Sequence, residues 1–143
     1  MQIVTEPVEY LAQWAADRIR GVEHFDNPAA IGVCRGDQLA AVAVYTDIKR
    51  WKGGGDCQIS FAADTPKWAT RETIGLFLGT PFQALGVSRI TALVKKGHKR
   101  SRKLIEGVGF KREGAVRRAD PDGSTLIIYG LLKEEFEAGK YGR

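Results

Sequence analysis

An unbroken run of local signals between residues 87 and 136 limits the possible folds of this chain more than any other feature. Residues 90–95 alternate Ile, Ala and Val with Thr, Leu and Lys, and only Lys95 is charged, which is typical of a strand covered on both faces. The apolar spacing then changes to the helical period over residues 99–108. Gly109 follows, where a helix C-terminus favours a left-handed backbone. The segment therefore predicts a buried strand and then one amphipathic helix.

The predicted helix has two chemically different faces. Ser101, Leu104, Ile105 and Val108 share the inner face, and Phe110 is placed to fold back onto the last turn. The other face and its flanks are basic: Lys95, Lys96, His98, Lys99, Arg100, Arg102, Lys103, Lys111, Arg112, Arg117 and Arg118. This basic cluster supplies much of the net charge of +5. It is interpreted as an anion-binding edge, a solvated helix face or a phosphate-binding stripe for nucleic acid, although no aromatic side chains interleave with it.

Strands are predicted on both sides of this helix. Turn sequences rich in Gly, Pro and Asp separate β-prone runs and predict one hairpin before the helix and one after it. The predicted strands are 2–4, 30–35, 39–48, 57–63, 90–95, 111–119 and 124–132.

Two further helices are predicted upstream. The first begins near Pro7, and Tyr10 and Trp14 broaden its apolar face. The second covers residues 70–78 and begins at a Thr N-cap. Trp51 is expected to pack on the core.

Composition is that of one ordinary globular domain spanning residues 1–143. The chain is 43% hydrophobic and has no linker-like segment. Its N-terminus lacks a signal-peptide pattern and no apolar run is long enough to span a bilayer, which predicts a cytoplasmic protein with no membrane partner. Cys34 and Cys57 have no metal-ligand or redox spacing, which predicts two reduced core thiols and no metal.

The predicted order of elements is that of an α/β fold. A strand, a helix, three antiparallel strands, a helix, a strand, a helix and a hairpin predict a central mixed, largely antiparallel sheet flanked by helices on both faces. This order resembles the GNAT acyltransferases over most of the chain, most strongly from residue 87 onward. On the helix after the fifth strand, many of these enzymes carry an Asn, a Ser or Ala, a Leu-Tyr pair and Gly-Phe. The matching residues here are His98, Ser101, Leu104-Ile105 and Gly109-Phe110.

Two branches of that superfamily look most similar. Acetyltransferases of ribosomal-protein N-termini also follow Gly-Phe with Glu-Gly and a basic strand, as Glu113-Gly114 and Arg117 do here. Phage and prophage GNAT-like proteins are similar around Pro81-Phe82 and Tyr129-Gly130.

The resemblance implies that acetyl-CoA is the acyl donor and that a primary amine attacks it directly in a ternary complex. Ala62 and Ala63 are then expected to bind the pantetheine arm, and the amides of Ala69, Thr70 and Arg71 to hold the pyrophosphate at a helix N-terminus. The glycine-rich loop of the family is missing, because residues 64–72 contain no glycine. The acceptor is expected to be a small-molecule or peptide amine, and the protein a monomer or a homodimer with aromatic contacts near Trp51 and Trp68.

The same resemblance places the catalytic residues on the helix. Ile105 replaces the Tyr that protonates the leaving thiolate in many relatives, so Ser101 is the expected hydrogen-bond donor; alternatively it is a small residue that allows close helix packing. His98 is expected to contact the cofactor or relay a proton, with an exposed loop histidine as the alternative. Arg102 is expected to contact the cofactor.

The acceptor side is predicted from two polar residues. Tyr129 is expected to line the acceptor cleft, with a core position as the alternative, and Asp56 is a carboxylate near the same side. Two other functions stay open: a phage-type GNAT-like protein that acts on nucleic acid or binds it through the basic helix, and a non-catalytic domain of the same fold.

Overall fold

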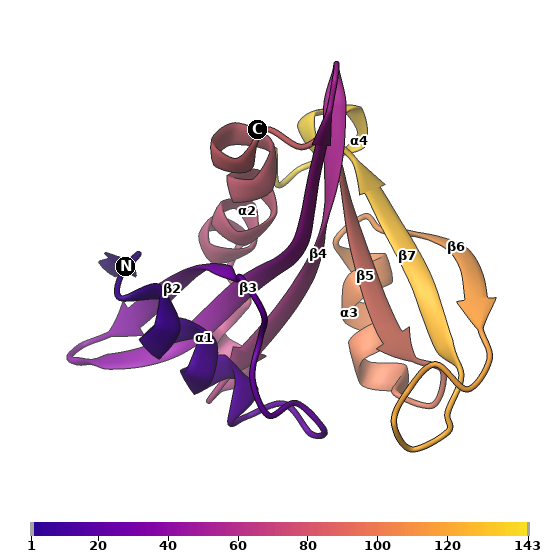
Figure 1. Ribbon diagram of the computed structural model, residues 1–143. Helices are drawn as coiled ribbons and strands as arrows, with labels where there is room; N and C mark the ends of the chain where they lie inside the picture. The colour runs from indigo at the N-terminus through magenta and orange to yellow at the C-terminus, as the bar shows by residue number, and fades with distance from the viewer. Residues whose placement is uncertain (1, 143) are drawn as a thin grey trace.

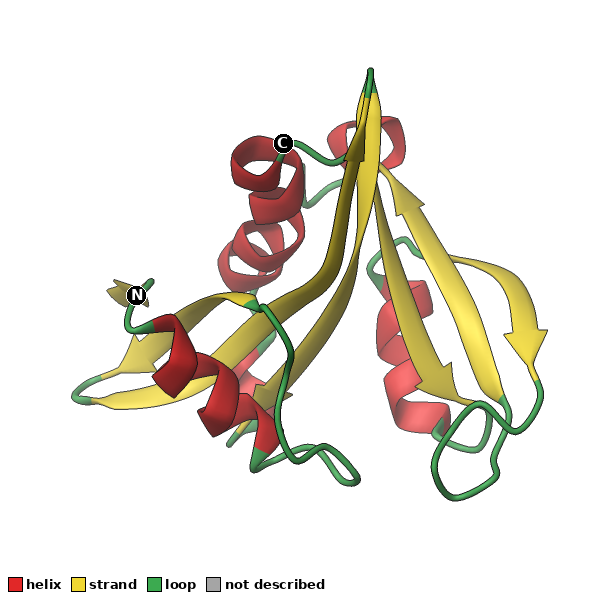
Figure 2. Ribbon diagram, viewed as in Figure 1, coloured by secondary structure: helices red, strands yellow, loops and turns green. Residues whose placement is uncertain are grey.

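The computed structural model of the chain describes residues 2–142, and Figures 1 and 2 show one twisted sheet with helices on both faces. The seven strands follow the order β1-β2-β3-β4-β5-β7-β6. In chain order the elements are β1 (Gln2–Val4), α1 (Val8–Ala16), β2 (Ala29–Arg35), β3 (Gln38–Trp51), β4 (Gly54–Ala63), the 3-10 turn η1 (Pro66–Trp68), α2 (Arg71–Thr80), the π-helical turn η2 (Pro81–Leu85), β5 (Arg89–Lys95), α3 (Lys99–Gly107), β6 (Lys111–Val116), β7 (Leu126–Leu132) and α4 (Lys133–Ala138). The predicted fold class is confirmed, and α4 is an addition that the sequence pattern does not predict.

A single parallel pair divides the sheet. All other neighbouring strands pair antiparallel. β4 and β5 pair in parallel only where residues 56–58 meet residues 89–91. Beyond this point the two strands diverge (Figure 1). The sheet is therefore joined at one end and split at the other into a β1–β4 half and a β5–β7–β6 half.

Helices cover the sheet unequally. On one face, Leu11 of α1 is buried with Val44 of β3. On the other face, α2, α3 and α4 bury Phe77, Ile105 and Phe136 against the larger core. Full burial of such a side chain stabilises the fold by about 1.5–3 kcal/mol. Because both faces of β3 are covered, its central run AAVAVY is apolar at every position.

Three sequence predictions about burial are wrong. α1 packs against β2, β3 and β4, so among the described residues no helix covers this face of β5. Leu93 is consequently 39% exposed, and the strand is not covered on both faces. Tyr10 is 60% exposed because it points away from the sheet, and Trp51 is 54% exposed because it lies at the projecting tip of the β3–β4 hairpin (Figure 1).

Helix ends follow the local signals closely. The Thr70 hydroxyl oxygen accepts a hydrogen bond from the Thr73 amide at 3.1 Å and caps α2. After α3, Gly109 has φ +115°, and the Phe110 amide donates to the Ile105 carbonyl at 3.1 Å. These predicted boundaries are confirmed.

Within the described residues, no helix is both long enough and apolar enough to cross a bilayer.

The two cysteines form no disulfide. Cys34 is half-buried and Cys57 is fully buried, and both are free. Burial raises the pKa of the Cys57 thiol to about 12, which keeps it protonated at neutral pH.

Candidate functional site

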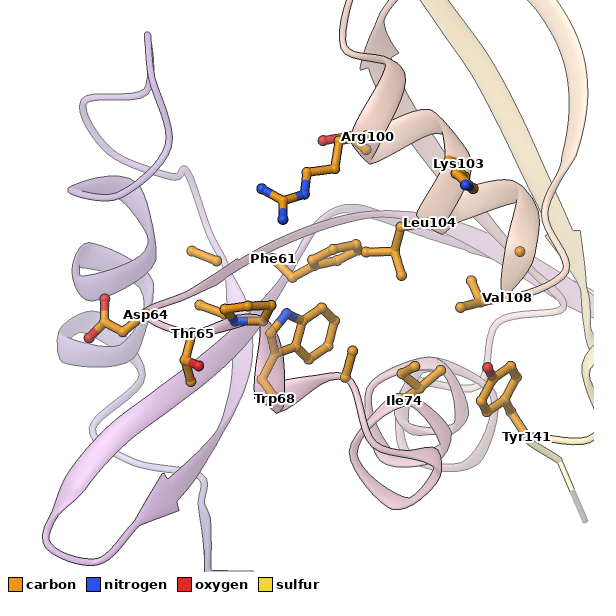
Figure 3. A pocket seen from close by; sticks show the side chains of 16 residues that line it. Phe61, Asp64, Thr65, Trp68, Ile74, Arg100, Lys103, Leu104, Val108 and Tyr141 are labelled. Carbon is orange, nitrogen blue, oxygen red and sulfur yellow. The ribbon is translucent and has the colours of Figure 1, made fainter.

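The divergence of β4 from β5 opens a cleft of about 750 Å³ (Figure 3), termed here the α2–α3 cleft. One wall is formed by the end of β4 and its connection to α2, and the opposite wall is α3. The lining residues are Phe61, Ala62, Ala63, Asp64, Thr65, Pro66, Trp68, Ala69, Ile74, Arg100, Ser101, Lys103, Leu104, Gly107, Val108 and Tyr141.

Aromatic packing forms the floor of this cleft. The Trp68 ring lies 5.7 Å from the Phe77 ring in a stacked arrangement and 5.4 Å from the Phe61 ring. Trp68 is half-buried, and a dimer contact near it stays a prediction. Its packing holds the β4–α2 connection against the core.

The β4–α2 connection uses its own amides. The Lys67 amide donates to the Thr65 hydroxyl oxygen at 3.3 Å, and the Trp68 amide donates to the Thr65 carbonyl at 3.3 Å. The Ala69 amide donates to the carbonyl of Pro66 at 3.4 Å, and the Thr70 amide to that of Trp68 at 2.7 Å. Because Pro66 has no N–H, residues 66–70 have no amide free to bind an anion.

Two of the predicted phosphate-binding residues lie away from the cleft. Thr70 lines a separate groove on the β2 side, and Arg71 lines neither cavity. Ala69 does line the cleft, but its amide is engaged in the turn. The predicted pyrophosphate site is corrected for the amides of Ala69 and Thr70, because without glycine the connection closes into a self-bonded 3-10 turn. Arg71 is the first residue of α2, and a role for its amide stays a prediction.

The backbone directions along β4 are set by contacts at its two ends. The Gly55 carbonyl accepts from the Ser88 amide at 3.0 Å, so the backbone groups of Gly55 point toward β5. The Asp64 amide donates to the Ala40 carbonyl at 3.0 Å, so the amide of Asp64 points toward β3. Backbone groups of successive strand residues point in opposite directions. Odd-numbered residues of β4 therefore face β5, or the cleft where β5 has diverged.

This alternation separates two predicted residues. The N–H and C=O groups of Phe61 and Ala63 face the open cleft, whereas those of Ala62 belong to the ladder with β3. Ala63 thus offers the strand-type hydrogen bonds predicted for a bound chain. Ala62 contributes only its side chain to the lining. The backbone groups of Phe61, not those of Ala62, have the direction needed for the predicted hydrogen bonds to a bound chain.

Cations occupy the α3 wall. Arg100 and Lys103 of α3 both line the cleft, and Arg100 extends toward Phe61 of the aromatic floor (Figure 3). Within residues 2–142 neither forms an ion pair. The carboxylate on the opposite rim, Asp64, is already paired with Arg18 at 2.7 Å. The cleft therefore has unpaired positive charge above an apolar floor, an arrangement that suits an anionic ligand with an apolar arm.

A second cavity lies on the α1 side of the split. It encloses about 280 Å³ between the loop after α1, the diverging strands and the start of α3, and is termed the α1-side pocket. Phe61 and Ser101 line both cavities. His98 lines only the α1-side pocket. The two cavities thus meet beside the exposed Ser101 side chain.

The other predicted site residues lie elsewhere. Tyr129 is fully buried; its hydroxyl donates to Glu106 at 2.6 Å and accepts from Arg102 Nε at 3.1 Å. Arg102 is also held by the Lys96 carbonyl at 2.9 Å, and hydrogen bonding to Tyr129 raises its pKa. Neither Tyr129 nor Arg102 lines a cavity, so the predicted cleft position of Tyr129 is corrected to its core alternative. The reason is that α3 covers this face of β7.

Asp56 lies at the joined end of β4 and β5. It accepts hydrogen bonds from Thr91 at 2.9 Å and from Arg89 at 3.3 Å. Arg89 also pairs with Glu113 at 2.8 Å, and this hydrogen bond raises its pKa. Asp56 lines neither cavity, so its predicted place on the acceptor side is corrected. It stabilises the strand junction instead.

Sequence reasoning gave no site role to Phe61 and Trp68, and it named Arg100 and Lys103 only as members of a basic cluster that one interpretation made an anion-binding edge. Trp68 has no periodic signal because it lies in a 3-10 turn. Arg100 and Lys103 directly precede Ser101 and Leu104 and therefore lie at the edge of the same helix face. This i, i+3 spacing could have predicted that both cations border the cleft.

The chain was compared with known proteins. No protein-family model matches it, and no curated protein resembles it in sequence. Among solved structures, it is similar to the ribosomal-protein-S5-alanine acetyltransferase of Vibrio fischeri, with a TM-score of 0.64 and 16% identity over 76% of this chain and 63% of that one. It is also similar to Mycobacterium smegmatis RimJ in complex with CoA-disulfide, with a TM-score of 0.68 and 17% identity over 80% of this chain and 57% of that one. A chimera of the spermidine N-acetyltransferase SpeG from Vibrio cholerae with hSSAT gives a TM-score of 0.73 and 14% identity over 95% of this chain and 99% of that one.

These likenesses confirm the predicted GNAT fold. At such identities they establish the fold alone. The chain spans less than two thirds of the length of the first two structures.

Proposed function

We propose that this protein transfers an acetyl group from acetyl-CoA to a primary amine, with the donor in the α2–α3 cleft and the amine in the α1-side pocket. The observation that carries the proposal is that two cavities, entered from opposite faces of a split sheet, meet at Phe61 and Ser101. Two reactants that enter from opposite faces come together at that point. This geometry suits direct attack within a ternary complex.

The lining of the α2–α3 cleft fits acetyl-CoA. Backbone groups of Phe61 and Ala63 offer strand-type hydrogen bonds to the amides of the pantetheine arm. Arg100 and Lys103 offer positive charge to the phosphates, in place of the amides that the β4–α2 connection uses internally. When bound, acetyl-CoA supplies an activated thioester. Its phosphates are thus held by side chains of α3 rather than by backbone at a helix N-terminus.

Ser101 and His98 are the residues proposed for proton handling. In the transfer, the amine nitrogen bonds to the acetyl carbon, the C–S bond breaks, and the thiolate leaves. The Ser101 hydroxyl, on the border of the two cavities, donates a hydrogen bond to that thiolate. His98, at the start of α3, passes the proton released by the amine to water. Tyr129 takes no part, because Glu106 and Arg102 engage its hydroxyl.

One observation favours a second candidate, nucleic-acid binding. Lys96, Lys99 and Arg117 are exposed and line neither cavity, so they remain available to phosphates. If this candidate is right, the protein binds duplex DNA with an affinity that falls steeply as the salt concentration rises. It does not bind acetyl-CoA.

The test is an acetyl-transfer assay of the purified chain with acetyl-CoA and a panel of primary amines, followed by thiol release and by product mass. Transfer to at least one amine is expected, with intersecting initial-rate patterns. Ser101→Ala is expected to lower kcat about tenfold, the loss of one hydrogen bond to developing charge.

Ser124→Ala is the matched control, because Ser124 lies in the β6–β7 connection and lines neither cavity. No transfer to any amine, together with no acetyl-CoA binding by calorimetry, contradicts the proposal and leaves a non-catalytic domain of the same fold.

A further inference from the structure

The α1-side pocket is small and has a distinctive set of charges. Its volume of about 280 Å³ suits a molecule the size of an amino acid rather than an extended chain. The charged and titratable groups that line it are Arg20, Lys95, His98 and Asp120. An amine acceptor has to be recognised by these groups and by the apolar walls.

The single carboxylate in this lining is not free to bind an ammonium group. Asp120 pairs with Lys95 at 3.3 Å, and its side chain also accepts from the Asp122 amide at 3.2 Å. Lys95 is further held by Asp122 at 2.8 Å. These contacts tie the charges of Lys95 and Asp120 to each other and to the β6–β7 connection. Neither is left to attract a ligand.

The remaining basic groups approach the pocket from two elements. Arg20 belongs to the loop after α1, and His98 precedes the first turn of α3. Within residues 2–142, Arg20 forms no ion pair and the His98 ring has no hydrogen-bond partner. The unpaired charge at the pocket is therefore positive.

We propose that the acceptor is a small primary amine that also carries a carboxylate or a phosphate, and that Arg20 binds this anionic group. This inference rests on the proposed function. Arg20 offers the forked donors that match either anion, and His98 flanks the same pocket. A polyamine offers no anionic group for Arg20 to bind.

The experiment compares matched acceptors with acetyl-CoA held saturating. Amino acids are measured against the amines left by their decarboxylation, O-phosphoethanolamine against ethanolamine, and spermidine alone. The first two sets distinguish a carboxylate from a phosphate. Each is run on the natural protein and on Arg20→Ala, Arg20→Lys and Arg112→Ala. Arg112 is an exposed control arginine that lines neither cavity.

The member of a pair that carries the carboxylate or phosphate is expected to have kcat/KM about 10- to 100-fold above that of the member without it, the value of one charge-assisted hydrogen bond. Arg20→Ala is expected to abolish this preference without changing the KM for acetyl-CoA. Arg20→Lys is expected to restore part of the preference, and Arg112→Ala to leave the preference intact.

Four results overturn the inference. Efficient transfer to spermidine, or a preference that survives Arg20→Ala, refutes it while the proposed acetyltransferase stands. Transfer to duplex DNA but to no small amine also refutes it. No transfer to any acceptor refutes both.

Discussion

The two walls of the α2–α3 cleft face each other but differ in the groups that they offer to an anion. On the β4–α2 wall, the amides of Lys67, Trp68, Ala69 and Thr70 all donate within the connection. On the α3 wall, Arg100 and its neighbour Lys103 have no ion-pair partner within residues 2–142.

In the proposed function, the phosphate site therefore lies on the α3 wall instead of the β4–α2 wall, without a change of fold. Backbone amides bind an anion only if the chain leaves them unpaired, which glycine permits. A glycine-free connection satisfies its own amides and becomes a rigid wall. Long cationic side chains on the facing helix then supply the charge.

The largest expected effect concerns the rigid wall. Trp68→Ala removes the ring that packs on Phe77 and Phe61, and is expected to lower the free energy of unfolding by about 3 kcal/mol. Thermal unfolding measures this. Trp51→Ala is the matched control, because Trp51 is 54% exposed. Equal losses in the two variants would show that Trp68 does not hold the wall.

The cationic wall is tested by removing both charges. Arg100→Ala combined with Lys103→Ala is expected to raise the Kd for acetyl-CoA about 10- to 100-fold. Calorimetry should show a much smaller effect with pantetheine, which lacks the phosphates. Lys67→Ala removes a cation of the β4–α2 connection that lines the separate groove on the β2 side, and should leave the Kd nearly unchanged. If Lys67→Ala has the larger effect, the phosphates lie against the β4–α2 wall after all.

The end of the rigid wall depends on one capping hydroxyl. Thr70→Ala leaves the Thr73 amide without its cap and is expected to cost about 1 kcal/mol of stability, whereas Thr70→Ser retains the hydroxyl. Denaturant unfolding compares the two. An unchanged Kd for acetyl-CoA in Thr70→Ala is expected, because Thr70 does not line the cleft. A large loss of binding would restore the helix N-terminus as the phosphate site.

The smallest effect concerns the half of the sheet behind α3. Two hydrogen bonds lower the pKa of Glu135. The larger effect comes from Lys111, at 2.5 Å, and the smaller from the Leu132 amide. A lowered pKa means that this stabilisation is present above the ordinary carboxyl pKa and is lost as pH falls through the folded-state value. Glu135→Gln is expected to cost less than about 1 kcal/mol at pH 7. Unfolding curves of the two proteins should converge in acid; a gap that persists there would show that charge is not the cause.

The candidate site was only partly predictable, and the reason differs by residue. Ser101 and Ala63 were found because they lie in regular elements whose periodicity assigns a face. Tyr129 was misplaced because a strand position does not reveal which helix will cover it. Arg100 was placed in a basic cluster interpreted as an anion-binding edge, a solvated face or a nucleic-acid stripe, and the sequence could not choose among these because it does not show that the sheet splits and leaves a cleft beside α3.

Local chemistry in the sequence determined the elements of this protein and their ends. Thr70 caps a helix, Gly109 ends one, and the apolar run of β3 marks a strand covered on both faces, because these effects act within a few residues. Only the tertiary structure decided that β4 and β5 diverge, which cations face the gap, and that Phe61 and Ser101 border two cavities. Those properties depend on the packing of segments distant in the sequence, and no local pattern encodes the space between them.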